Sequence, residues 1–171
     1  FQLPAQQLIK GVPMLRKVLP FSAYAEGWAL YAERVAKVDM GFYESDPLGD
    51  LGRLQAELFR AVRLVVDTGM HARHWSREQA IEYMVAKTGM TEAEVTREIE
   101  RYVVWPGQAT SYKVGQLAML RMRDEAQQAL GPRFDLRAFH ELILMNGSMP
   151  LAVLEDVVRE WVKTQQGMPA A

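Results

Sequence analysis

The sequence contains no cysteine in its 171 residues. It therefore has no disulfide framework, no thiolate metal ligand and no cysteine nucleophile, and any metal ion must be bound by histidine, aspartate or glutamate. The missing cysteine does not decide the compartment, because periplasmic proteins often lack it as well. The periplasm and the cytoplasm both stay open.

An excess of charge of one sign is also missing, since the sequence has 20 basic and 21 acidic residues and a net charge of −1. This balance provides no general attraction for nucleic acid, which is not an expected partner. No apolar run approaches 18 residues, so no membrane-spanning helix is expected. The first residues include neither an initiator methionine nor the basic start of a signal peptide, and we expect the sequence to be a piece of a longer chain.

The residues present are typical of a globular domain, with 49% hydrophobic and 24% charged side chains. No segment alternates polar and apolar residues as a half-buried strand does, whereas proline and glycine separate stretches with a helical period. The sequence predicts a single all-α domain over residues 1–171, with about seven to eight helices. They are expected near residues 3–18, 22–39, 47–71, 76–88, 91–103, 106–130, 135–145 and 150–165.

Several helix ends are specified locally. Ser76 and Thr91 begin capping boxes, and Pro47 and Pro106 are each expected at a first helical position. Glycines are expected to end four helices, at Gly41, Gly89, Gly131 and Gly147. Residues 165–171 are expected to fray.

Glu26 is the first candidate site residue. Its helix carries apolar or small residues on nearly every face, which predicts burial all round. Glu33 lies seven residues on, on the same face, and has Lys37 one turn further, but no basic residue lies one turn from Glu26. A buried lone carboxylate costs several kcal/mol, so Glu26 needs a cation, hydrogen-bond donors or a metal ion. A buried ion pair with an arginine stays open as the alternative.

The helix expected over residues 47–71 has two contrasting sides. Aliphatic residues predict a core stripe on one side, at Leu51, Leu54, Leu58, Val62 and Val65. Charged residues share the other side, at Arg53, Arg60, Arg63, Asp67 and His71. This side is either solvated or, because it is rich in arginine and histidine, part of a fixed network or an anion site. His71 and His74 have the spacing of two metal ligands, which is a weak signal.

A third segment, residues 105–116, combines small and polar residues. Gln108 and Tyr112 share a face, and Lys113 lies about 100° further round the helix. A helix start of this kind can bind an anion such as a carboxylate, or it can simply pack on a neighbouring helix. His140 is expected to be a partly exposed helical histidine and not a ligand.

Residues 26–33 (EGWALYAE) resemble a bacterial family, domain-of-unknown-function family eight-eight-five, whose members are similar to gluzincin metallopeptidases. Matching segments continue over essentially the whole chain, at residues 41–47, 63–75, 79–83, 100–102, 106–115 and 134–140. Members carry a His-Glu-x-x-Pro-Gly-His-His metal motif shortly before the Glu-Gly-Trp helix. That motif is not in this sequence, and we expect residue 1 to follow it closely.

The resemblance implies the C-terminal part of a zinc-dependent peptidase, an exopeptidase acting on peptides. Glu26 would be a zinc ligand, while the histidine ligands and the general base would come from the missing N-terminal part. Tyr112 or His71 would donate to the oxyanion of the tetrahedral intermediate. The residues implied to hold the substrate's terminal carboxylate are Lys113, Gln108 and Arg101. Because a zinc site needs about three protein ligands, this chain alone is expected to be inactive.

Two other interpretations stay open. One is a non-catalytic helical interaction module, with a buried ion-pair network of Glu26, Arg60, Asp67 and His71 and a cleft for a partner segment. The other is a metal site within this chain, formed by Glu26, His71 and His74. In addition, truncation would expose apolar surface along residues 3–18 and 22–39, through which two copies could form a homodimer.

Overall fold

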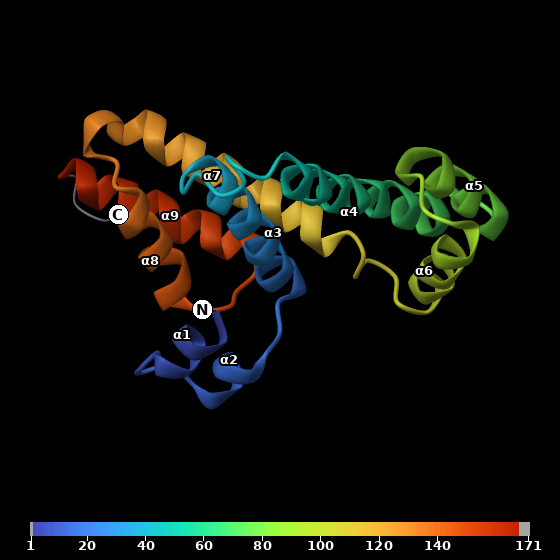
Figure 1. The fold of residues 1–171 in the computed structure, drawn as a ribbon. Coiled ribbons are helices and arrows are strands. Elements are labelled where there is room, and N and C mark those ends of the chain that lie inside the picture. Colours follow the sequence, from blue (N-terminus) through green and yellow to red (C-terminus); the bar gives the residue numbers. More distant parts are fainter. Residues whose placement is uncertain (1, 168–171) are drawn as a thin grey trace.

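The computed structural model describes residues 2–167, and within this range the chain is all-helical with no strand, as predicted. Figure 1 shows the arrangement of the helices. They are α1 (Gln2–Leu8), α2 (Met14–Val18), α3 (Ser22–Val38), α4 (Pro47–Arg73), α5 (Arg77–Thr88), α6 (Glu92–Val104), α7 (Ser111–Leu130), a 3-10 turn (Gly131–Arg133), α8 (Leu136–Asn146) and α9 (Leu151–Gln166). The fraying expected at the C-terminal end falls mostly on residues 168–171, outside the described range.

The predicted caps are confirmed where local chemistry determines them. Ser76 and Thr91 both form complete capping boxes at the starts of α5 and α6. Asp46 caps α4 by accepting from the Gly49 N–H at 2.9 Å, directly before Pro47. Gly89 ends α5 in the left-handed conformation.

Two predicted helix boundaries are wrong. The helix expected over residues 3–18 is divided into α1 and α2, because Gly11 takes a left-handed φ of +76° and Pro13 starts a new helix. The helix expected from Pro106 begins instead at Ser111. In the preceding turn, Gly107 has a φ of +83° and donates its N–H to the carboxylate of Asp67 at 3.0 and 3.1 Å. A tertiary hydrogen bond therefore replaces the first helical turn.

The buried apolar side chains form two clusters. The first joins α3, α7, α8 and α9 around large buried side chains such as Tyr31, Met119 and Phe139. The second joins the C-terminal half of α4 to α5 and α6, around Val66, Met84 and Ile99. In Figure 1, α4 extends from α3 and α7 to the α5–α6 pair at the far end of the molecule. No helix within residues 2–167 has the length and apolar character needed to cross a membrane.

The prediction of a core stripe on α4 is wrong. Of its five members only Val62 is buried, whereas Leu51, Leu54, Leu58 and Val65 are between 37% and 61% exposed. α4 instead buries Val66 against α5 and α6, and buries the charged side that contains Arg63 and Asp67. The turn at residues 105–110 binds that charged side, as the Asp67–Gly107 bonds show. The leucines consequently have no covering helix in the described part of the chain.

Helices α3 and α7 cross in close backbone contact. A Cβ atom added to Gly27 would lie 2.6 Å from the Gly115 carbonyl carbon, and one added to Gly115 would lie 2.6 Å from the Gly27 Cα and closer still to the Ala23 oxygen. Only two glycines allow this approach. The fully buried Gln116 adds a bond from its amide to the Leu30 oxygen at 3.2 Å. This crossing places Glu26, next to Gly27, beside the start of α7.

His140 of α8 is a partly exposed helical histidine, as predicted, and it packs beside the same α3 helix. Its Nε2 lies 2.7 Å from the Tyr31 hydroxyl, and the rings of Trp28 and Phe139 pack around it. Burial, followed by the nearby charge of Arg123, lowers the pKa of His140 below its usual 6.5. The folded protein therefore favours the neutral imidazole.

We expect this histidine to make folding stability fall on mild acidification. Between pH 6.5 and the lower folded pKa, the unfolded chain binds a proton that the native chain does not, so the free energy of unfolding decreases as the pH falls. Urea denaturation at pH 7.5 and 5.5 measures the decrease, which we expect to be smaller in His140→Gln. Equal decreases in both proteins would show that His140 is not responsible.

Candidate functional site

Glu26 is half-buried on α3 and has a single weak donor among the residues that the structure describes. Its Oε1 lies 3.4 Å from the amide nitrogen of Gln108. No lysine, arginine or histidine nitrogen within the described residues lies within 4.0 Å of its carboxylate. Glu26 also lines a surface pocket of about 530 Å³ together with Gln2, Pro4, Ala25, Trp28, Ala29 and Ala32. Its negative charge therefore lacks a cationic partner and borders space that a ligand can enter.

Gln108 connects Glu26 to two arginines. Its Oε1 accepts from Arg63 Nη2 of α4 at 3.2 Å and from Arg101 Nη2 of α6 at 3.1 Å. We call Glu26, Arg63, Gln108 and Arg101 the Gln108 cluster. Three of its members were predicted as site residues, and the structure brings them together from three separate segments.

Arg63 is the member that the sequence prediction did not include. It was placed on the charged side of the α4 helix, but nothing distinguished it there from its neighbours. The contact with Gln108 spans 45 residues of sequence. The only local signal was the turn after α6, whose Pro106 and Gly107 break the helix and bring Gln108 back to α4.

Tyr112 and Lys113 contact different residues of α4. The ring of Tyr112 stacks on the Arg63 guanidinium, 4.5 Å from Cζ to the ring centre, so Tyr112 adjoins the Gln108 cluster. Lys113 does not, because its Nζ pairs with Glu57 and donates to Gln116 Oε1, each at 2.7 Å. The predicted carboxylate-binding lysine is already engaged within the fold.

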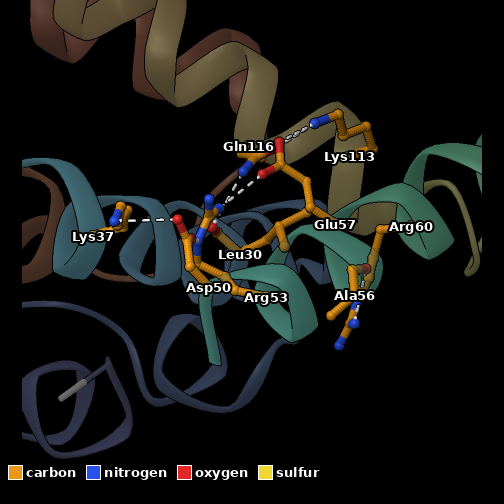
Figure 2. A network of polar contacts seen from close by, with 9 residues as sticks. All are labelled: Leu30, Lys37, Asp50, Arg53, Ala56, Glu57, Arg60, Lys113 and Gln116. Atoms are coloured by element: carbon orange, nitrogen blue, oxygen red, sulfur yellow. Dashed lines mark hydrogen bonds and ion pairs between the residues drawn. The ribbon is translucent and has the colours of Figure 1, made fainter. Parts of the chain in front are cut away.

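Lys113 belongs to a network that joins three helices, shown in Figure 2. Glu57 binds both Lys113 and Arg53, at 2.7 and 3.2 Å, and Asp50 binds Arg53 and Lys37, at 2.8 and 3.1 Å. Lys37 was expected to pair with Glu33, but in the structure Lys37 pairs with Asp50 of α4. Burial alone would raise the pKa of Glu57, but the charges of Lys113 and Arg53 hold this pKa below its usual value. Glu57 therefore stays ionised at neutral pH and links α4 to α7.

His71 is held by Asp67 of the preceding turn. Its Nδ1 lies 2.9 Å from both the backbone oxygen and the Oδ1 of Asp67. Since both of these oxygens only accept, Nδ1 carries a proton that it donates to Asp67. The buried Asp67 also binds the Gly107 N–H, so this pair orients the turn that carries Gln108.

Of the ion-pair network and the metal site considered from the sequence, the structure forms only part of the network. The Asp67–His71 pair forms, but no ion pair within residues 2–167 connects it to Glu26 or Arg60. His74 ends α4 in the left-handed conformation. Among the described residues, no three histidine, aspartate or glutamate side chains are placed to hold a metal ion. The structure thus does not assemble Glu26, His71 and His74 into a metal site.

Comparison with known proteins identifies a protein family and a similar solved structure. A family model described as "Bacterial protein of unknown function (DUF885)" matches residues 1–158. A crystal structure from Colwellia psychrerythraea, of a protein described as a "putative lipoprotein", superimposes with a TM-score of 0.92 and is 54% identical. The match covers 95% of this chain and 28% of that chain. No curated protein matches the sequence.

Proposed function

Since the chain belongs to DUF885, a bacterial family of unknown function, we propose that it is the C-terminal portion of a zinc-dependent peptidase in which Glu26 binds the metal. The family predicted from residues 26–33 is thereby confirmed, and its relation to gluzincins is part of the proposal. The observation that carries the proposal is the environment of the Glu26 carboxylate. A half-buried carboxylate at the edge of a pocket, with no cationic partner in the described part of the chain, is suited to a metal ligand.

In this proposal the other zinc ligands come from outside this chain, since no group of three possible ligands forms among the described residues. The chain spans 28% of the length of its solved relative. The uncovered leucines of α4 and the exposed side chains of α2, including Met14, Leu15 and Val18, provide apolar surface on which more polypeptide can pack. We infer that a preceding part of the polypeptide covers these faces and supplies the histidine ligands and the general base. A second copy of the chain is the other occupant to be tested, since a homodimer would cover the same surface.

This chain's own residues would orient the substrate. Zinc, when bound, would activate water and polarise the scissile carbonyl. Tyr112 is the better of the two oxyanion donors, because its ring lies against Arg63 of the Gln108 cluster, whereas the His71 ring is held by Asp67. Gln108 and Arg101 belong to the same cluster as Glu26, and they would hold the terminal carboxylate of a peptide. Lys113 instead keeps α4 and α7 together through Glu57.

The second candidate is the non-catalytic interaction module. The contact of the buried Asp67 with His71 and the uncovered leucines of α4 favour it, because both are consistent with a structural unit that binds a partner segment. It requires neither a metal ion nor a reaction.

Zinc content and peptide hydrolysis, measured side by side on two proteins, separate the candidates. One protein is this 171-residue chain, and the other extends upstream through the His-Glu motif. We expect about one zinc per molecule and peptide cleavage in the longer protein only, because one carboxylate cannot hold the ion. If the longer protein binds no zinc and cleaves no peptide, the peptidase proposal fails and the interaction module is the better explanation.

A further inference from the structure

Arg63 carries a buried positive charge that nothing in the described chain neutralises. Its side chain belongs to a residue only 4% exposed, and its Nε is buried without a hydrogen-bond partner. No carboxylate oxygen within residues 2–167 lies within 4.0 Å of its guanidinium nitrogens. The neighbouring Arg60 also has a buried Nε without a partner. Buried charges in proteins are normally paired, so this side of the cluster lacks an anion.

The surroundings of Arg63 compensate its charge only in part. Aromatic rings pack around its guanidinium carbon, those of Tyr112, Tyr102 and Phe59, with centres at 4.5, 5.3 and 5.4 Å. Cation–π contacts of this kind stabilise a guanidinium and fix its orientation. Within the described residues, its one side-chain hydrogen bond goes to Gln108 Oε1, a neutral oxygen that Arg101 shares. Two guanidinium groups thus converge on a position that an anionic oxygen would fill better.

The nearby carboxylates are engaged elsewhere. Glu98 lies 3.4 Å from Arg101 and accepts from the Tyr102 hydroxyl at 2.7 Å, without contacting Arg63. Glu26 reaches the arginines only through the Gln108 amide. Asp67 is bound by His71 and Gly107.

We propose that Arg63 and Arg101 together bind a carboxylate, and that this is the free carboxyl end of a peptide. A charge-assisted hydrogen bond is about twice as strong as a neutral one, so a carboxylate would displace Gln108 Oε1 from both guanidinium groups. The planar fork of arginine matches the two carboxylate oxygens, which a lysine does not. The carboxylate site follows from the charges, while the choice of a peptide as its ligand rests on the proposed function.

The test compares two pools of peptides randomised at every position, one with free and one with amidated carboxyl ends. Each is dialysed against the longer protein with zinc removed by a chelator, and bound peptide is quantified by mass spectrometry. Binding is thereby read without hydrolysis. We expect the free-carboxylate pool to bind about 10- to 100-fold better, as for a hydrogen-bonded charge. Arg101→Gln and Arg63→Lys should each remove at least about 10-fold of this preference, and the exposed Arg137→Gln should leave it unchanged.

Equal binding of the two pools by the unmodified protein overturns the proposal, and an acidic residue of the longer polypeptide seated on Arg63 would give this result. A preference that survives in Arg101→Gln and in Arg63→Lys overturns it as well. If Arg63→Lys does not fold, Arg101→Gln decides, because Arg101 is exposed. If the preference for carboxylate is found in a protein that cleaves no peptide when zinc is restored, the carboxylate site stands and the peptidase function fails.

Discussion

Replacing Gly115 with alanine is expected to be among the most destabilising single changes in this fold. The new methyl group would overlap the backbone of α3 at Ala23 and Gly27, and neither helix has a flexible side chain there that can move aside. Overpacking in cores costs about 1–3 kcal/mol, and a backbone-to-backbone clash belongs at the upper end of that range. For a chain of this size, 3 kcal/mol lowers Tm by about 10 °C. Thermal unfolding followed by circular dichroism measures the effect.

Gly52 provides the matched control. It is also helical, in α4, but a Cβ atom there would meet nothing within 4 Å. Gly52→Ala should therefore stabilise the protein by about 0.5–1 kcal/mol, through the better helix propensity of alanine. If the two substitutions shift Tm in the same direction, the close α3–α7 crossing does not determine stability.

This crossing also explains part of the Glu-Gly-Trp segment in physical terms. Gly27 admits the α7 backbone, and Trp28 packs on Tyr31 and His140. Glu26 precedes both and points to Gln108. The segment therefore combines a packing requirement with a candidate ligand, and the sequence alone could not separate the two roles.

Local chemistry made most of the helices predictable. Ser76 and Thr91 satisfy the first N–H groups of their helices with their own side chains, so neither start depends on distant residues. Pro106 was likewise a local signal for a helix start, but the helix predicted to begin there begins at Ser111. Its neighbour Gly107 is bound by Asp67, 40 residues away, and a bond of that range has no trace in local sequence.

The α4 helix shows why the direction of a helix face is harder to predict than the helix itself. Leu54 and Leu58 carry the more apolar face, and a single amphipathic helix would bury it. Arg63 and Asp67 are buried instead, because turn residues Gly107 and Gln108 provide hydrogen bonds for them. Whatever covers the leucines cannot be identified from a helix period.

Three of the four members of the Gln108 cluster were predicted from the sequence, but their assembly was not. Glu26 was identified because no local cation matches it, and the structure provides none within the described range. Gln108 and Arg101 were implied by family resemblance, and they do lie together. Arg63 was missed because a buried arginine and an exposed one look alike in sequence, and only the absence of a carboxylate around it in three dimensions singles it out.

Glu26→Gln is expected to have the largest effect on function. In the longer protein that carries the His-Glu motif, the change keeps the size of the side chain and its reach to Gln108 but removes the negative charge that would bind zinc. Changes to residues that only contact zinc ligands already weaken metal binding by 10- to 100-fold, so loss of a ligand should exceed about 100-fold. We expect sub-stoichiometric zinc by elemental analysis and no detectable peptide hydrolysis.

Glu33→Gln is the control that gives this result its meaning. Glu33 lies on the same helix, two turns after Glu26 and on the same face, but it is exposed and is not expected to be a ligand. Its substitution changes the net charge of the chain by the same amount, so zinc content and hydrolysis should stay normal. Normal zinc in Glu26→Gln would remove Glu26 from the metal site, and its carboxylate would then serve only to hold Gln108. Loss of zinc in both variants would point to a charge effect along α3 instead of a bond from Glu26.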